Sequence, residues 1–527
     1  MSVKSVYNFV PAPKESEVFK PDWADQVSHD LPFNDGESGE IEIKITAETP
    51  IFIRNGHSKG NESNEFSHYV IDGKKKYFIP ATSLKGMFRN VLEMITNSRM
   101  NLTSSISEKN PVTYGMRDMN NPEYSADNAK VKSGWLVKEE SGWVIQSCIN
   151  HKLALSDIER KFHLTQGELK DSGVNKNELC KNKIKDKKFN FSFSKNLGNW
   201  VGKQYKFDNE GDFKGYIVLY GDIDNKRYDY IFSELIRNTY SVDSKLVETL
   251  DNIENNGENK DDSLWLYFRK ENWQPGIPVF FTLNEDKQTV KHFGLTKLYR
   301  RNNSHYLNNL QPLKSYLEST EKEKLDFAEL LFGNVRSEAL KGRVFISHAW
   351  ADNAETGNEE ERILNSPKPS FYPAYLKQDG SKGQLKGAYK TYHNEDAELK
   401  GFKRYPVHNR IKPNMESENE NIASKFIPLK DGAIFSEKIR YFNLRPCEIG
   451  ALVSAITFHG NSEKFFHSIG GAKPYGFGKV KIQIANFDDF SKYLKEFEFV
   501  MNTHLKGKQL VNQENIKELL IDFLNKV

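Results

Sequence analysis

The stretch Ile79-Pro-Ala-Thr-Ser-Leu-Lys-Gly-Met-Phe-Arg89 predicts a strand that passes directly into a helix. Its proline ends the extended run, and Thr82 or Ser83 is placed to cap the helix. Apolar residues then recur at the spacing of one helical face: Leu84, Met87, Phe88, Val91, Leu92 and Ile95. A helix N-terminus attracts phosphate, so Ser83, Lys85 and Arg89 are candidate polyanion contacts. An ordinary core helix with solvated cations would show the same pattern.

A second informative stretch, Ile469-Gly-Gly-Ala-Lys-Pro-Tyr-Gly-Phe-Gly-Lys479, precedes an alternating strand near the other end of the chain. Glycine lets the backbone approach a polyanion, lysine neutralises phosphate, and an aromatic ring stacks on a base. The candidate contacts are Gly470, Gly471, Lys473, Gly476, Phe477 and Lys479, with Tyr475 as a second stacking ring. The alternative is a plain turn with solvated lysines.

Composition limits where such a site can be. The 527 residues include 75 basic and 72 acidic ones, a formal net charge of +3, so any polyanion site must be a local patch. Cys148, Cys180 and Cys447 show no CxxC spacing, which favours a reducing compartment over a disulfide framework or structural zinc. No run approaches the ~20 apolar residues of a membrane span. We therefore expect a cytoplasmic protein without a membrane partner.

Taken together, the two stretches resemble the RAMP (repeat-associated mysterious protein) superfamily of CRISPR-associated RNA-binding proteins. Further matches follow in family order: Leu331-Phe-Gly333, Gly342-Arg-Val-Phe-Ile-Ser347 and Leu444-Arg-Pro-Cys-Glu-Ile-Gly-Ala-Leu452. Two short segments resemble a subgroup found with type III systems: Ser366-Pro-Lys-Pro369 and Leu399-Lys-Gly401. The chain departs from the family pattern at Ala81, where glycine is usual, and at Ala472.

The core elements, taken without the long excursions, follow the order strand, helix, strand, strand, helix, strand. This is the ferredoxin-like (RRM-like) arrangement, so we expect an α+β fold with a RAMP core, large β-rich insertions and a C-terminal helical extension. The expected parts are an N-terminal arm (1–39), the core (40–99 and 331–485, with 350–430 an excursion from it), a β-rich insertion (100–330) and C-terminal helices (486–527). Within the insertion, residues 135–145 predict a hairpin, and residues 228–238 and 245–253 predict short helices.

The resemblance implies a guide RNA (crRNA) binding subunit of a type III CRISPR-Cas effector complex, a ribonucleoprotein of antiviral defence. Guide RNA, complementary target RNA and other effector subunits are the implied partners. The candidate contacts named above would hold the guide backbone. The alternatives are a stand-alone endoribonuclease that processes precursor guide RNA, and a structural subunit that contacts only protein.

Some related backbone subunits cleave target RNA with an acidic residue in the loop before the first core helix. The matching loop, residues 54–68, contains no aspartate, and counting back from Ile79 makes Glu65 the first catalytic candidate and His57 the second. A histidine can act as general base and a carboxylate can hold Mg²⁺. A magnesium-dependent endoribonuclease activity is therefore left open, and no other cofactor is expected. A solvated loop with scattered charge is the alternative.

Two further patterns lie between residues 348 and 410. His348 and Asp352 follow the predicted central strand closely enough to pair, although a polar strand end is the simpler interpretation. Lysines and arginines alternate with aromatic residues between Lys368 and Arg410, including Lys403-Arg-Tyr405. This composition suits single-stranded nucleic acid or a neighbouring subunit.

Overall fold

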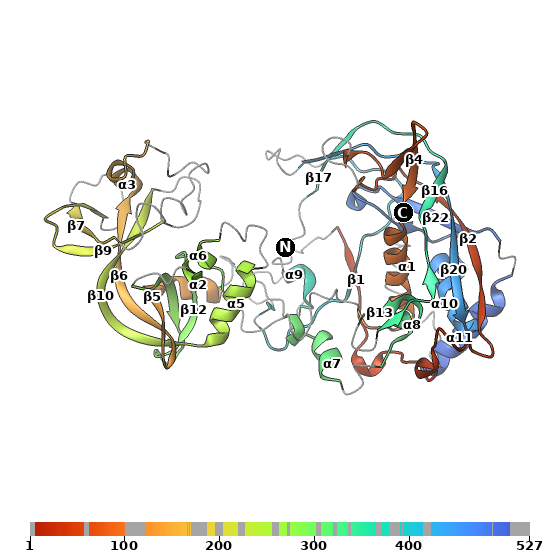
Figure 1. Ribbon diagram of the computed structural model, residues 1–527, viewed down its shortest axis with the longest axis horizontal. Helices are drawn as coiled ribbons and strands as arrows, with labels where there is room; N and C mark the ends of the chain where they lie inside the picture. The colour runs from red at the N-terminus through yellow and green to blue at the C-terminus, as the bar shows by residue number, and fades with distance from the viewer. Residues whose placement is uncertain are drawn as a thin grey trace. The chain divides into compact units, whose positions relative to one another are not determined.

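The structure is a computed structural model in which two compact units are distinguished (Figure 1). One unit holds residues 1–2, 105–309 and 378–395, and the other holds residues 3–104, 310–377 and 396–527. The described residues are 6–56, 63–100, 122–165, 167, 169, 187–194, 204–219, 227–255, 263–270, 275–301, 307–319, 324–335, 339–364, 372–378, 390–392, 394–414, 423–486 and 489–505.

The second unit is built on an antiparallel sheet with the strand order β21-β22-β2-β20-β16-β4-β3, and β15 also pairs with β20. Its strands are β2 (Glu37–Ala47), β3 (His68–Ile71), β4 (Lys74–Ile79), β15 (Val344–Phe345), β16 (Ala349–Asn353), β20 (Ile434–Leu444), β21 (His467–Ser468) and β22 (Lys479–Ile484). Along β2 and β20, buried and exposed residues alternate. One face of the sheet is therefore buried and the other is open.

The buried face shares one hydrophobic core with α1 (Ala81–Ile95) and α10 (Pro446–Thr457), and Figure 1 shows α1 alongside the strands. Antiparallel strands and helices in one core confirm the predicted mixture of α and β structure. In chain order, β2, α1, β16, β20, α10 and β22 follow one another, and their four strands lie side by side as β22-β2-β20-β16.

Shorter elements complete the second unit. They are β1 (Asn8–Val10), α7 (Leu313–Glu318), α8 (Phe327–Phe332), β13 (Gly333–Asn334), β14 (Leu340–Lys341), β17 (Glu360–Ile363), α9 (Tyr372–Tyr375), β18 (Phe402–Arg404), β19 (Ala423–Phe426) and α11 (Ser491–His504). Of the predicted C-terminal helical extension, α11 is described, and the second predicted helix lies outside the described residues. None of the described helices is long and apolar enough to cross a membrane.

The start of α1 differs from the prediction. The helix begins at Ala81, with Pro80 in the capping position and no side-chain cap, so neither Thr82 nor Ser83 caps it. Instead His348 Nδ1 accepts a hydrogen bond from the Ala81 N–H at 3.0 Å. The acceptor comes from 267 residues away, which no local pattern could indicate. His348 is therefore not paired with Asp352, which accepts a hydrogen bond from Ser436 Oγ.

The predicted central strand, residues 342–347, is shortened to β15, which pairs with β20, and the pairing along β20 resumes at β16. Between them, the Ser347 N–H donates a hydrogen bond to the Glu437 carboxylate instead of to a backbone oxygen of β20. Arg343, at the start of this segment, has its side chain fully buried in an ion pair with Glu448 of α10, at 2.6 Å from Nη2 to Oε1 and 2.9 Å from Nη1 to Oε2. Arg343 also donates to the carbonyl oxygens of Leu330 and Asn443. One side chain thus joins α8, β20 and α10.

The first unit has its own eight-stranded sheet, in the order β10-β9-β7-β8-β6-β5-β11-β12, and its own core. The strands are β5 (Lys132–Glu139), β6 (Gly142–Ala154), β7 (Phe189–Ser194), β8 (Gln204–Phe207), β9 (Phe213–Val218), β10 (Tyr228–Val242), β11 (Ile277–Leu283) and β12 (Val290–Gly294). The helices are α2 (Pro122–Ala129), α3 (Leu155–Lys161), α5 (Ser244–Asn255) and α6 (Leu264–Lys270).

Within this unit, the predicted hairpin is β5–β6 and the predicted helix over 245–253 is α5. The helix predicted over 228–238 is wrong, because these residues form most of β10, which pairs with both β6 and β9. Tertiary pairing outweighs the local pattern there. Residues 310–330 belong to the second unit rather than to the predicted insertion. There, Tyr316 donates a hydrogen bond to the Pro13 carbonyl oxygen.

Replacing Arg343 by methionine should test the ion pair between Arg343 and Glu448. The variant leaves the Glu448 carboxylate buried without its cation, so we expect the free energy of unfolding to fall by about 3–5 kcal/mol. The double variant Arg343→Met/Glu448→Leu should regain a large part of this loss, because neither charge of the pair is then left in the core. Urea unfolding followed by circular dichroism measures both.

Arg440→Met is the matched control, since Arg440 also pairs with a glutamate, Glu40, but its side chain is 69% exposed. The control should lose less than about 1 kcal/mol. Equal losses in Arg343→Met and Arg440→Met would contradict the assigned role of the buried pair.

Candidate nucleic-acid interface

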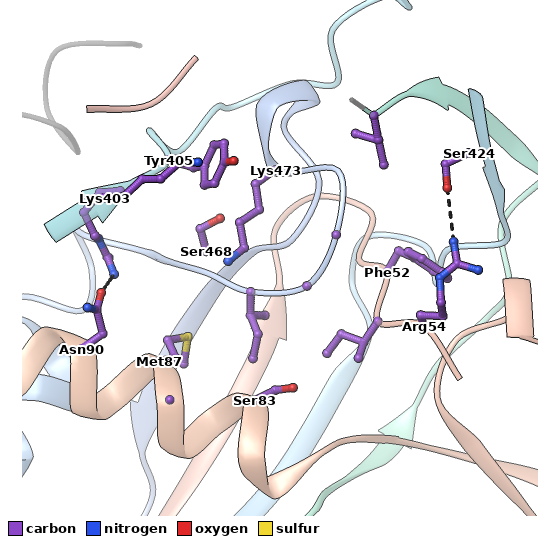
Figure 2. Close-up of a pocket in the computed structure, with 17 residues that line it drawn as sticks. Phe52, Arg54, Ser83, Met87, Asn90, Lys403, Tyr405, Ser424, Ser468 and Lys473 are labelled. Carbon is purple, nitrogen blue, oxygen red and sulfur yellow. Dashed lines mark hydrogen bonds between the residues drawn. The ribbon is translucent and has the colours of Figure 1, made fainter. Parts of the chain in front are cut away.

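A cavity of about 800 Å³ opens in the second unit, between the first turns of α1 and the glycine-rich loop that precedes β22. Its lining comes from segments far apart in the sequence (Figure 2): Phe52, Ile53, Arg54, Ser83, Gly86, Met87, Asn90, Leu364, Lys403, Arg404, Tyr405, Ser424, Ser468, Ile469, Gly470, Gly471 and Lys473. Four of these 17 residues are cationic and none is acidic. The cavity therefore suits an anion.

The glycine-rich loop is pressed against the segment that follows β2. Gly470 has a φ of +88°, and a Cβ atom there would lie 2.2 Å from the Phe52 carbonyl oxygen. The Gly471 N–H donates a hydrogen bond to the same oxygen at 2.8 Å. Ala472 is buried with a φ of +53°, a conformation that glycine adopts more readily. The loop is thus held in a strained, close-packed conformation beside the cavity.

Lys473 extends from this loop into the cavity, toward Ser468 (Figure 2). Its burial, and secondly the nearby Arg404 guanidinium, lower the pKa of the Lys473 amine to about 8. Within the part of the chain that the structure describes, no carboxylate pairs with this amine. A half-buried ammonium without a counter-ion is unfavourable, and a bound anion would supply the missing negative charge.

The other cations of the cavity are held in place by neutral groups. Arg404 donates to Asn90 Oδ1 at 2.9 Å, and Arg54 donates to Ser424 Oγ at 3.2 Å, both drawn in Figure 2. The Lys403 ammonium lies 4.0 Å from the centroid of the Tyr7 ring and 5.3 Å from that of Tyr405. Cation–π contacts and side-chain oxygens thus position these charges at the cavity.

The predicted contacts divide into two groups. Ser83, Gly470, Gly471 and Lys473 line the cavity. The remaining predicted residues, Lys85, Arg89, Gly476, Phe477 and Lys479, do not line it. In α1, the helical repeat places Ser83, Gly86, Met87 and Asn90 on one stripe and Lys85 and Arg89 on another.

The residues outside the cavity have other contacts. The Lys85 ammonium lies 5.8 Å from the centroid of the Phe332 ring, and burial, then Arg89, lower the Lys85 pKa. Arg89 donates to Glu93 Oε1 at 2.9 Å. Lys479 donates to Asn409 Oδ1 at 2.7 Å. Phe477 is 2% exposed and packs edge-on against Phe426, so in this structure its ring offers no face to a base.

Gly476 and Tyr475 help to shape the loop. A Cβ atom on Gly476 would lie 2.5 Å from the Arg410 carbonyl oxygen. Tyr475 is buried and its hydroxyl donates to the Ile363 carbonyl oxygen at 3.1 Å. Sequence reasoning did not assign Arg54 and Asn90 to the site. Lys403 and Arg404 were signalled only by the alternation of cations and aromatic residues around them.

Of the two catalytic candidates, His57 lies outside the described residues. The Glu65 carboxylate forms an ion pair with the Lys75 ammonium, and Glu65 Oε2 lies 3.8 Å from His68 Nδ1. Among the described residues, no group of three or more His, Cys, Asp or Glu side chains could hold a metal ion. Glu65 is thus neutralised by a lysine in this structure.

Part of the sequence resembles a known protein family. Residues 44–266 match the model of the RAMP superfamily. The predicted resemblance to the RAMP superfamily is confirmed. The RAMP match covers less than half of the chain, and it includes the end of β2 and all of α1 but not the glycine-rich loop. No curated protein matches the sequence.

Two solved structures show distant likeness to this RAMP-like chain. One, titled "CRISPR RNA-guided surveillance complex, pre-nicking", has 10% identity and a TM-score of 0.23 over 89% of this chain and 88% of the other. The other, Csc2 of Thermofilum pendens, has 13% identity and a TM-score of 0.14 over 36% of this chain and 49% of the other. At TM-scores this low, neither solved structure indicates the fold of this chain.

The half-buried charge of Lys473 predicts that replacing this lysine with an uncharged residue stabilises the folded protein. Because its folded pKa of about 8 lies below the ordinary value of 10.5, the folded protein disfavours the charged amine. This penalty is fully present below pH 8 and disappears as the pH rises toward 10.5. We therefore expect Lys473→Met to raise the free energy of unfolding at pH 7 by about 1–3 kcal/mol, with a smaller gain at pH 9.5.

Urea unfolding at the two pH values measures this difference. The matched control is Lys314→Met, which removes a lysine whose side chain is 47% exposed on α7. The control should change stability by less than about 0.5 kcal/mol at either pH. A loss of stability in Lys473→Met at pH 7 would show that the ammonium has a stabilising partner, and would contradict the assignment.

Proposed function

We propose that this chain is a guide RNA (crRNA) binding subunit of a CRISPR effector complex, and that the cavity around Lys473 holds a phosphate of the guide backbone. The RAMP match supports the class of protein. The observation that carries the proposal is the half-buried Lys473 ammonium, without a carboxylate partner among the described residues, in a cavity lined by three further cations. A phosphate would bring negative charge to this cationic cavity.

The chemistry of the cavity favours recognition of backbone rather than of sequence. Glycine backbone, serine hydroxyls and lysine or arginine cations recognise phosphate and sugar, and these groups carry no base code. A guide must be held whatever its sequence, so this is the type of contact that a guide-binding subunit needs. Guide RNA, complementary target RNA and other effector subunits are the proposed partners, and antiviral defence is the proposed role.

Two finer points belong to the same proposal. The strand order β22-β2-β20-β16 and the two helices packed in the same core support a ferredoxin-like (RRM-like) core, which recurs in RNA-binding proteins. Assignment to type III systems rests on the resemblance of residues 366–369 and 399–401. Gly401, in the second of these segments, has a φ of +117°, and a Cβ atom there would lie 2.1 Å from the Val10 carbonyl oxygen. The absence of a side chain at this position therefore allows β1 to pack closely against it.

Binding measurements with the Lys473 variant test the proposal. Wild-type protein should bind single-stranded RNA of mixed sequence, and Lys473→Met should weaken binding about tenfold for every sequence. The slope of log binding constant against log salt concentration should become shallower by about one, because one phosphate contact is lost. Wild-type affinity should also fall between pH 7 and 9, because bound phosphate stabilises the protonated amine. In Lys473→Met, this pH dependence should be smaller.

Two lysine variants serve as comparisons. Lys314→Met, away from the cavity, should bind RNA like the wild type. Lys85→Met separates the structural assignment from the sequence prediction, because Lys85 contacts Phe332 and does not line the cavity. If Lys85→Met weakens binding more than Lys473→Met does, the phosphate site lies elsewhere. If the wild-type protein binds no RNA, the alternative of a protein-only subunit is favoured.

Cleavage of target RNA by the loop at residues 54–68 is a separate proposal. If Glu65 is the catalytic acid, Glu65→Gln should slow Mg²⁺-dependent cleavage by the assembled complex by orders of magnitude and leave RNA binding intact. Lys75→Gln is the matched control, because it breaks the same ion pair from the other side. A structural role for Glu65 would give equal effects in both variants.

His57→Ala tests the second catalytic candidate in the same assay. Cutting of precursor guide RNA by the isolated chain, without target RNA, would favour the stand-alone endoribonuclease. If the wild-type complex cleaves and all three variants cleave equally fast, the chemistry lies outside this loop.

A further inference from the structure

The open face of the sheet in the second unit carries an aromatic ledge, formed by Tyr69 of β3, Phe78 of β4 and Trp350 of β16. Tyr69 and Trp350 are each 38% exposed, whereas Phe78 beneath them is fully buried. Ile71, on the same face of β3 as Tyr69, is also 38% exposed. Large apolar side chains exposed together at the edge of a sheet mark a candidate binding surface.

The two exposed rings are held from below. The Tyr69 ring lies nearly parallel to that of Phe78, with centroids 4.8 Å apart and an interplanar angle of 12°. Trp350 lies 5.2 Å from Phe78, and His348 packs against Phe78 at 4.5 Å. Because Phe78 fixes both rings, a planar ligand could stack on them without first ordering them.

Cations surround the ledge on the same face of the sheet. In the pairing of β3 with β4, Tyr69 lies opposite Lys76 and Ile71 lies opposite Lys74. Residues directly opposite in a pair point to the same side, and both lysines are exposed. Neither lysine forms an ion pair among the contacts of the described residues.

A third cation continues the same surface. Lys44 of β2 lies opposite Ser436, which itself lies opposite Trp350, so Lys44 is two strands away from Trp350, at about 10 Å. Of the carboxylates on this face, that of Asp352 accepts a hydrogen bond from Ser436, and those of Glu40 and Glu42 form ion pairs with Arg440 and Lys438. Lys44, Lys74 and Lys76 therefore give the surface around the ledge an excess of positive charge.

We propose that the ledge stacks the bases of unpaired RNA. Exposed rings supported by a sheet and surrounded by lysines are the means by which single strands are held, since every base has an aromatic face and every linkage a negative charge. A protein-binding surface is expected to be depleted of lysine, and here Lys76 lies directly opposite Tyr69 and Lys44 lies two strands from Trp350 on the same face. The occupant that fits is a single-stranded RNA segment.

This inference rests on the proposed function, because it assigns the ledge to the same RNA as the cavity. The connection is the beginning of α1. His348 packs against Phe78 of the ledge and also accepts the hydrogen bond from Ala81, while Ser83 and Gly86 of the same helix line the cavity. Figure 1 places β4 and β16 together at the end of the sheet where α1 begins. A strand leaving the cavity toward this end would reach the ledge.

The experiment compares RNA with a matched oligomer that lacks bases. Tyr69→Leu/Trp350→Leu should bind single-stranded RNA of mixed sequence about tenfold or more weakly than the wild type, with an unchanged salt slope, because bases and not phosphates are lost. Its affinity for the abasic ribose-phosphate oligomer should equal that of the wild type. Phe499→Leu, which changes a 70% exposed ring on α11, is the matched control and should bind both like the wild type.

The outcomes separate the two proposals. If Lys473→Met weakens RNA binding but the double variant binds RNA as tightly as the wild type, the ledge assignment is overturned and the proposed function stands. If the double variant binds RNA normally but fails to assemble with other subunits, the ledge is a protein interface and the assignment is again overturned. If the wild type binds neither oligomer, the proposed function itself fails. Circular dichroism establishes that each variant is folded.

Discussion

The second unit depends on one fully buried ion pair, Arg343 with Glu448. Glu448 accepts hydrogen bonds from Trp23 Nε1 in the N-terminal segment and from the Arg445 N–H at the start of α10. Arg343 reaches α8 and the end of β20. A buried charge is tolerated only when each of its polar atoms has a partner, so these elements must all come together at once. The Arg343 carbonyl oxygen also accepts a hydrogen bond from the Phe442 N–H, so the buried ion pair lies where the pairing of β15 with β20 begins.

That arrangement sets the position of the cavity. With β16 beside β4, His348 reaches the beginning of α1 and supplies the hydrogen-bond acceptor that the helix lacks locally. The helix is then fixed so that Ser83, Gly86 and Asn90 face the glycine-rich loop. The loop carries two unfavourable features, a half-buried ammonium at Lys473 and an alanine in the left-handed conformation at Ala472. Strain and unpaired charge of this type concentrate at functional sites.

The cavity and the aromatic ledge lie on two sides of the beginning of α1, and they suit different parts of an RNA. Cations and glycine backbone in the cavity suit phosphate, and the rings of Tyr69 and Trp350 suit bases. The ledge uses the open face of the sheet, whereas the cavity lies between a loop and a helix. A chain that combines both could hold an RNA by its backbone and still keep a few bases in a defined stack.

The sequence by itself determined the local elements: the amphipathic face of α1, the alternation in β2 and β22, the hairpin β5–β6, and the glycine-rich loop with Lys473. Each of these elements is recognised from a repeat of apolar residues or from a composition within one short segment of the chain. Tertiary structure alone decided that Tyr228–Val242 is a strand, since its pairing partners are remote. It also decided that His348, and not Thr82 or Ser83, completes the start of α1.

The same division holds for the candidate site. Lys473, Ser83, Gly470 and Gly471 were predicted from their own motifs, whereas Lys85 and Arg89 share a motif with Ser83 but lie on another stripe of the helix. Arg54, Asn90, Lys403 and Arg404 join the cavity because strand pairing and helix packing bring remote segments together. A motif records which residue types are adjacent in the chain, but the direction of each side chain depends on the packing of the whole unit.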